Sequence, residues 1–311
     1  MEISGHCDER FSVVQDAFES NFLADEELGA SAAVTVEGQY VVDLWGGERN
    51  KSGDPWEEDT IVNVYSTTKT MASICMLMLA DRGLIDFEAP VADYWPKFAA
   101  NGKDSVLVRH VMTHQTGCSG FPRPVTVEEL YDHDLMADLL AGMQPWWEPG
   151  TAPGYHAITQ GTLQAELLRR VDGRTLGTFF RDEVTRPLNA DFHIGLPLSE
   201  GHRVAQLDVP KEGIDQIVEG QPDSVALRTF RSCRLDGTET ETDEWRSAEI
   251  PAGGGIGNAR SISRVHSAVA CGGTIDGITL MNPETIEAAL DRQTFDRDLV
   301  LGLNVPYGTG F

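Results

Sequence analysis

The feature that most constrains the fold of this chain is a long apolar run that extends from Thr67 to Gly83. Placed on a helix, its apolar side chains cover nearly the whole circumference: Met71, Ile74, Met76, Leu77 and Leu79. A helix that is apolar on all sides must be enclosed by other elements. Gly83 is a typical residue at a helix end. The pattern therefore predicts a buried central helix around which the rest of the chain packs.

The composition is sufficient to enclose such a helix, because 41 % of the 311 residues are hydrophobic. A chain of this length forms two domains, or one large domain with an insertion. The 24 Lys and Arg residues are outnumbered by 49 Asp and Glu residues, which gives a net charge of −25. Phosphate backbones and anionic membranes require clustered cations. We therefore predict neither nucleic acid nor a membrane as a partner.

Features of export are not found in the sequence. No apolar run approaches the roughly 18–20 residues that cross a bilayer, and Met1–Phe11 lacks the cationic and apolar regions of a secretory signal. The five cysteines are scattered and form no Cys-x-x-Cys, so neither a disulfide framework nor a zinc knuckle is indicated. These observations predict a soluble, reduced, cytoplasmic protein.

The N-terminal part predicts a sheet and a helix. Glu9–Leu28 has the near-helical spacing of an amphipathic helix. Ala32–Val36 and Tyr40–Trp45 flank a Glu37-Gly38 turn and predict a β-hairpin, and Thr60–Tyr65 is a third extended run. Because strands follow one another without alternating helices, a doubly wound parallel sheet is disfavoured and an α+β fold is favoured.

The middle of the chain predicts helices and loops, with frequent prolines between Phe87 and Leu188. Further helices are predicted at Leu163–Val171, Leu176–Glu183, Ser261–Ala270 and Met281–Leu290, the last with Asn282 as its cap and Pro283 in its first position. Residues 200–248 show only weak periodicity and receive no assignment. The organisation predicted is a sheet domain built from residues 1–86 and 249–311, with a mainly helical domain at 87–248.

A Ser-x-x-Lys sequence stands at the start of the apolar helix, with Ser66 and Lys69 one turn apart. Side chains at positions i and i+3 share a helix face, so the hydroxyl and the amine can meet. A serine hydroxyl becomes a nucleophile when a neighbour takes its proton, and burial lets a lysine do so by lowering its pKa. The helix start also offers N–H groups to an oxyanion. The alternative is a capping serine followed by a solvated lysine.

A second candidate element is the loop Pro149–Ala157, in which two Pro-Gly steps present Tyr155. A tyrosine near cationic groups can be held partly as phenolate and act as a base. The alternative is a loop tyrosine that packs and forms hydrogen bonds.

The order of these motifs resembles the serine β-lactamase and penicillin-binding-protein superfamily, from about residue 10 to the end of the chain. More narrowly, it resembles the class C-like branch, which includes the bacterial family VIII carboxylesterases. The segments that carry the resemblance are Asp59–Lys69, Leu107–Gly117, Pro149–Tyr155, Phe179–Pro187 and Asp191–Pro197. The resemblance implies a β-lactamase-like α+β fold, in which an antiparallel sheet is flanked by helices and carries a mostly helical insertion.

The resemblance implies a serine hydrolase that acts through an acyl-enzyme on small carboxylic esters, without a cofactor or metal. Ser66 would attack the carbonyl, Lys69 and Tyr155 would share the proton transfers, and the Ser66 N–H would form half of the oxyanion hole. The residues that would line the substrate pocket are Trp147, Ala157, Gly254 and Gly255. Ala157 stands where relatives carry Asn or Ser, which favours esters over β-lactams.

One departure from the family concerns the second oxyanion donor, which relatives take from a Lys-Thr-Gly or a variant of it on an edge strand. Gly308-Thr309-Gly310 has no preceding cation, so this donor is not assigned. The resemblance implies that the last strands and the C-terminal helix of the family are missing here. The alternatives are β-lactamase, amidase or acyltransferase chemistry at the same site, or a non-catalytic ligand-binding relative.

Other motifs are given structural interpretations. Ser119 lacks the complete Gly-x-Ser-x-Gly of an α/β-hydrolase elbow and is interpreted as a loop serine. His110 and His114 lack the Glu of a zinc-binding His-Glu-x-x-His and are interpreted as structural histidines. Asp132–Asp134 is interpreted as a surface turn. Gly253–Gly257 breaks the dinucleotide spacing and is interpreted as a loop beside the site.

Overall fold

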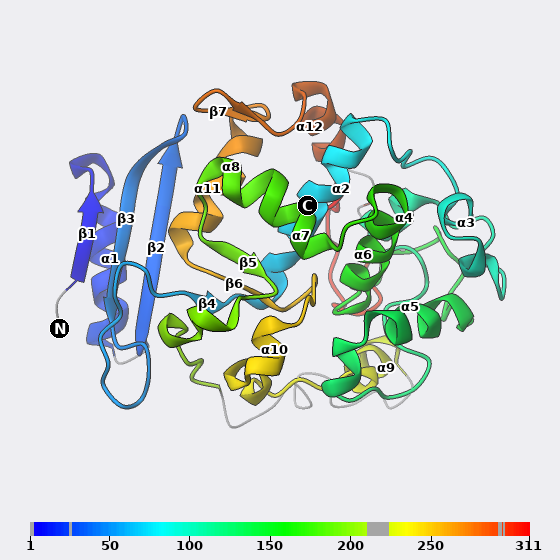
Figure 1. Cartoon of the computed structure of the whole chain (residues 1–311), viewed down its shortest axis with the longest axis horizontal. Coiled ribbons are helices and arrows are strands. Elements are labelled where there is room, and N and C mark those ends of the chain that lie inside the picture. The colour runs from blue at the N-terminus through cyan, green and yellow to red at the C-terminus, as the bar shows by residue number, and fades with distance from the viewer. Residues whose placement is uncertain (1–2, 25–26, 210–223, 292–293, 295) are drawn as a thin grey trace.

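The predicted central helix is present in the computed structural model, which describes residues 3–24, 27–209, 224–291, 294 and 296–311. It consists of a single 3-10 turn, η2 (Tyr65–Thr67), followed by α2 (Thr68–Asp81). Every residue of α2 from Met71 to Leu79 is buried. α2 runs through the middle of the molecule and contacts α6 (Thr159–Asp172), α7 (Leu176–Phe180) and α12 (Pro283–Leu290) (Figure 1).

The predicted N-terminal hairpin is confirmed and forms part of an antiparallel sheet. β2 (Gly29–Val36) and β3 (Gln39–Gly47) are joined by Glu37 and Gly38, whose φ angles of 50° and 78° suit a tight hairpin turn. β1 (Ile3–Cys7) pairs with the other edge of β3, which gives the order β1-β3-β2.

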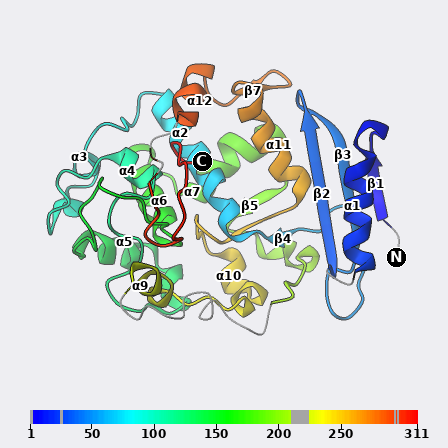
Figure 2. The same cartoon turned by 180° about the vertical axis from the view of Figure 1, so that it is seen from behind.

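A helix lies against the β1 and β3 part of this sheet, as Figure 2 shows, and it is shorter than predicted. The predicted segment 9–28 begins as the 3-10 turn η1 (Glu9–Phe11), and α1 (Ser12–Leu23) ends well before Leu28. Phe18 of α1 joins Val42 and Leu44 of β3 in a small core. The apolar pattern therefore identified the helix but not its end.

A second antiparallel sheet lies beside α2 and is built from very short strands. Its order is β4-β6-β5, where β4 is Val62–Asn63, β6 is Gly255–Gly257 and β5 is Phe192–Ile194. The predicted extended run 60–65 contributes only two strand residues, because the chain turns into η2 at Tyr65. A cavity of about 1330 Å³ lies between the β2 edge of the first sheet and β4 and β6 of the second.

The segment that connects the sheets is mainly helical, as predicted. Before α6 it contains α3 (Val91–Tyr94), η3 (Pro96–Ala99), α4 (Val108–Met112), η4 (Glu128–Tyr131) and α5 (His133–Gly142). The predicted helix 176–183 is α7, continued by the π-helical turn η5 (Arg181–Thr185) and by α8 (Arg186–Leu188). The division at 87 and 248 stays a prediction, and β5 crosses it by pairing with β6.

The unassigned segment 200–248 contains short helices wherever it lies within the described residues. These are η6 (Leu198–Arg203), α9 (Val225–Ser232), η8 (Thr238–Glu241) and α10 (Asp243–Ser247). After it come α11 (Ala259–Ala270), which contacts β2, and the hairpin of β7 (Thr274–Ile275) and β8 (Ile278–Thr279). Over the described ranges, no helix has both the length and the apolar character needed to cross a membrane.

The predicted start of the last helix is confirmed in position: Asn282 is the N-cap residue of α12 and Pro283 follows it in the first turn. The Asn282 side chain does not bond the helix; its Nδ2 donates to Asp81 Oδ2 at 3.2 Å. Asp132 and Asp134 are exposed as predicted, but they form no turn. The Asp132 carboxylate caps α5 by accepting the N–H of Leu135, and the His133 ring bonds the buried Glu166.

Candidate active site

The backbone that carries Ser66 makes an unusual turn just before α2. Tyr65 has a φ of 41°, a left-handed conformation that is uncommon for a residue with a large side chain. Its hydroxyl donates to Glu239 Oε1 at 2.8 Å, which anchors the residue in this conformation. Ser66 follows in η2 and is exposed. The turn therefore presents the serine at the surface at the start of a buried helix, a role of Tyr65 that no sequence pattern indicated.

Lys69 is buried on the first turn of α2, with only 6 % of its surface exposed. Its Nζ donates to Ser66 Oγ at 3.1 Å and to the carbonyls of Ala157 (2.7 Å) and Ala252 (2.9 Å). Burial lowers the pKa of Lys69 to about 7, because the charged ammonium loses hydration. The predicted meeting of the hydroxyl and the amine is confirmed, and the alternative of a solvated lysine is wrong.

Tyr155 reaches the same serine from the distant loop. Its Oη donates to Ser66 Oγ at 2.6 Å, and the Lys69 Nζ lies 4.8 Å from the centre of its ring. Burial raises the pKa of Tyr155, and Asp298 raises it further, although the bond to Ser66 opposes the shift. At neutral pH the phenol is therefore protonated. The hypothesis of a partial phenolate does not hold for the resting site, since burial raises the pKa of Tyr155 by more than the bond to Ser66 lowers it.

His114 holds the loop that carries Tyr155 through two hydrogen bonds. The N–H of His156 donates to His114 Nδ1 at 3.0 Å, and the N–H of Gly154 donates to the His114 carbonyl at 2.9 Å. Burial holds the pKa of His114 well below its ordinary value, so the ring is neutral and can accept. His110 likewise accepts the N–H of Leu107. The interpretation of both as structural histidines is confirmed.

The four residues expected to line the pocket are placed differently from one another. Trp147 is half-buried; its indole N–H donates to Ala152 O at 2.9 Å, and its ring lies against Gly154. The Ala157 carbonyl accepts from Lys69. Gly254 and Gly255 are buried. The N–H of Gly254 donates to the Ile250 carbonyl, and the N–H of Gly255 donates to Thr68 Oγ1 on α2. A substrate contact for any of the four stays a prediction.

The other motifs do not join the site. Ser119 is buried in a loop and its hydroxyl bonds that of Thr229 at 2.6 Å, as a structural serine would. Gly310 packs against Ser73 of α2, so the Gly308–Gly310 sequence does not lie on a sheet edge beside Ser66. Within the described residues, Gly308–Gly310 belongs to no strand, and the second oxyanion donor stays unassigned.

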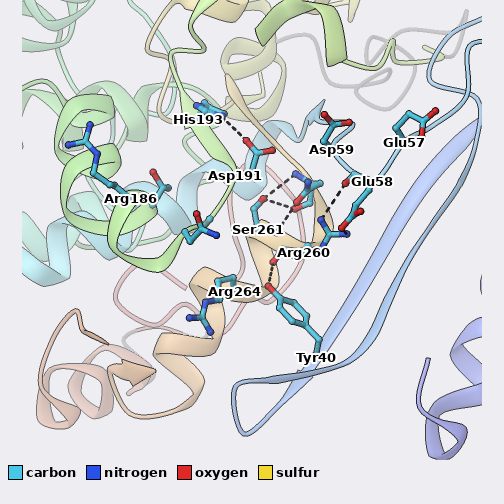
Figure 3. A pocket seen from close by; sticks show the side chains of 14 residues that line it. Tyr40, Glu57, Glu58, Asp59, Arg186, Asp191, His193, Arg260, Ser261 and Arg264 are labelled. Atoms are coloured by element: carbon cyan, nitrogen blue, oxygen red, sulfur yellow. Dashed lines mark hydrogen bonds and ion pairs between the residues drawn. The ribbon is translucent and has the colours of Figure 1, made fainter. Parts of the chain in front are cut away.

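A cavity of about 870 Å³ lies elsewhere, and Ser66, Lys69 and Tyr155 are not among its lining residues (Figure 3). Its arginines are already paired with carboxylates: Arg186 with Asp182, Arg260 with Asp43 and Glu58, and Arg264 with Asp276. The Asp191 carboxylate on its wall binds Arg203 and His193. These charges serve to join elements of the fold, and the cavity does not replace the serine site as a candidate.

A family model described as Beta-lactamase matches residues 16–311. The chain belongs to the Beta-lactamase family. Among the relatives of this family member is the esterase/beta-lactamase LipL of Mycobacterium tuberculosis, which is 39 % identical over 319 residues that cover 98 % of this chain and 74 % of LipL.

Solved structures of the Beta-lactamase family agree with this assignment. A family VIII carboxylesterase is 40 % identical and superimposes with a TM-score of 0.93, covering 100 % of this chain and 83 % of that one. A penicillin-binding protein homolog from Caulobacter crescentus is 39 % identical with a TM-score of 0.90 and the same coverage. The resemblance stated from the sequence and the β-lactamase-like α+β fold are both confirmed.

Proposed function

We propose that this chain is a serine carboxylesterase in which Ser66 forms an acyl-enzyme with small carboxylic esters. One observation carries the proposal: Ser66 Oγ lies within hydrogen-bond distance of both Lys69 Nζ (3.1 Å) and Tyr155 Oη (2.6 Å). A nucleophile bonded to a base of lowered pKa is the arrangement that serine acyl transfer requires.

Lys69 is the general base in this proposal. The neutral amine has two N–H donors, which match the two carbonyl acceptors of Ala157 and Ala252. Its lone pair is then left for the Ser66 hydroxyl, so in the neutral amine the bond between the two groups is reversed and Ser66 Oγ donates to Nζ. As Oγ bonds to the ester carbonyl carbon, the serine proton passes to Nζ, and the carbonyl oxygen becomes an oxyanion that the Ser66 N–H stabilises.

Tyr155 completes the proton transfers. The bond between the carbonyl carbon and the leaving oxygen breaks, and the departing alkoxide takes a proton from the Tyr155 phenol, which recovers it from the Lys69 ammonium. Water then attacks the acyl-enzyme while the amine takes its proton, and Ser66 leaves with a proton returned through the same pair. The protonated state of the half-buried phenol suits it for donation to a leaving group.

Esters are preferred as substrates for two reasons. The similar proteins include LipL, named an esterase/beta-lactamase, and a family VIII carboxylesterase. In addition, Ala157 offers only a methyl group where an Asn or Ser side chain would contact the acylamide of a β-lactam. We also propose that the protein acts in the cytoplasm without nucleic acid or membrane partners, since its net charge is −25 and its five cysteines are free.

The proposal is tested by comparing the hydrolysis of 4-nitrophenyl butyrate with that of a chromogenic cephalosporin. We expect kcat/KM for the ester to exceed that for the cephalosporin by at least about tenfold. A cephalosporin rate above the ester rate would replace the carboxylesterase assignment with β-lactamase. Hydrolysis of neither substrate, together with no labelling of Ser66 by a fluorophosphonate, would favour the non-catalytic alternative.

A further inference from the structure

A buried carboxylate that has no part in the mechanism above lies behind Tyr155. Asp298 is 0 % exposed, and its Oδ1 accepts the N–H groups of Tyr155 (3.1 Å), Val300 (2.8 Å) and Leu301 (2.7 Å). Its Oδ2 accepts the hydroxyl of Tyr307 at 2.9 Å. All four partners are donors, so both carboxylate oxygens serve as acceptors. Four hydrogen bonds therefore fix the Asp298 side chain in its buried place.

The backbone of Tyr155 depends on this carboxylate. Residues 153–156 belong to no helix or strand, so no regular element holds them. The N–H groups on either side of Tyr155 bond to His114, but that of Tyr155 itself bonds to Asp298. Next to Asp298, the N–H of Leu299 donates to the carbonyl of residue 153 at 2.9 Å. The segment around Asp298 thus holds the loop at the residue whose side chain reaches Ser66.

We propose that Asp298 is a positioning residue for Tyr155: by accepting the Tyr155 N–H it fixes the loop so that Oη stays within hydrogen-bond distance of Ser66 Oγ. The inference rests on the proposed function, in which Tyr155 moves protons at Ser66. A displacement of about 1 Å at a reacting group can lower a rate about 10²-fold. Loss of the carboxylate would also leave buried N–H groups unpaired, which the loop can relieve only by moving.

A double-mutant cycle tests this positioning role. We expect D298A to lower kcat/KM for 4-nitrophenyl butyrate about 10²-fold in the wild-type background, and less than about threefold in the Y155F background, because Asp298 acts through the phenol. D298N keeps an oxygen for the three N–H groups, and the Tyr307 hydroxyl can turn to accept from its amide. We therefore expect D298N to stay within about tenfold of wild type. D43N is the matched control, since it removes a carboxylate from an ion pair in β3.

Equal losses from D298A in both backgrounds would overturn the proposal and indicate a general structural role. Y155F with near wild-type activity would instead contradict the proposed role of Tyr155, so the two failures are distinguishable. A measurement on the wild type is available if D298A does not fold: hydrogen exchange of the Tyr155 amide. We expect this amide to be protected in wild type and D298N although it lies in a loop, and rapid exchange in wild type would overturn the proposal.

Discussion

Replacement of Ser66 with alanine is expected to lower kcat for ester hydrolysis by at least about 10⁴-fold, because no other group then forms the acyl-enzyme. Ser66 is exposed in η2, and within the part of the chain that the structure describes its side chain bonds Lys69 and Tyr155, the two residues that activate it in our proposal. The S66A protein should therefore fold normally. Steady-state kinetics with 4-nitrophenyl butyrate, together with thermal unfolding, measure both properties.

The matched control for S66A is S119A. Ser119 belongs to the Gly-Cys-Ser-Gly sequence, the nearest approach in this chain to another nucleophile motif. It is buried against Thr229, so its loss should change kcat of the folded protein by less than about threefold. A large loss of activity in S119A, combined with retained activity in S66A, would indicate that Ser119 is the nucleophile and would contradict our assignment.

Replacement of Lys69 with alanine is expected to lower kcat/KM by about 10³-fold, since a positioned general base contributes 10²–10⁴-fold. The pH dependence gives the sign of the effect. Burial lowers the pKa of Lys69 to about 7, so the amine is free above that pH and protonated below it. The wild-type kcat/KM should therefore rise through pH 7 and fall about tenfold for each unit below it, whereas K69A should lack this limb.

K97A is the control for this prediction, because Lys97 is 59 % exposed and pairs with Asp138 at the surface. We expect K97A to keep both the rate and the pH profile of wild type. If K69A hydrolysed the ester at nearly the wild-type rate, or kept the limb near pH 7, another group would have to be the base.

The parts of the fold that are set by local patterns could be predicted from the sequence. The apolar circumference of α2 required burial, and the Glu37-Gly38 turn specified the hairpin. The second sheet could not be predicted, because its strands have only two or three residues. They form by pairing with segments that are far away in the sequence. Gly257, for example, faces both Val62 and Phe192. Such short runs carry no usable periodicity.

The candidate site, like the fold, could be predicted from the sequence only in part. The Ser66 and Lys69 pair follows from helical spacing, and Tyr155 was found through a loop motif and a family resemblance. The burial that sets the protonation of Lys69 and Tyr155 depends on tertiary packing. Asp298 carried no sequence signal, since its bond to Tyr155 joins residues 143 positions apart. Patterns thus indicated the groups that we propose to react, but not the groups that hold them.

The central claim, that Ser66 becomes acylated, is tested most directly by rapid acid quench during hydrolysis of 4-nitrophenyl butyrate, followed by peptide mass spectrometry. The account predicts a butyryl group on the peptide that contains Ser66, formed in wild type and absent from S66A. Turnover of the ester with no acyl group on the protein, or with the group on another residue, would contradict it.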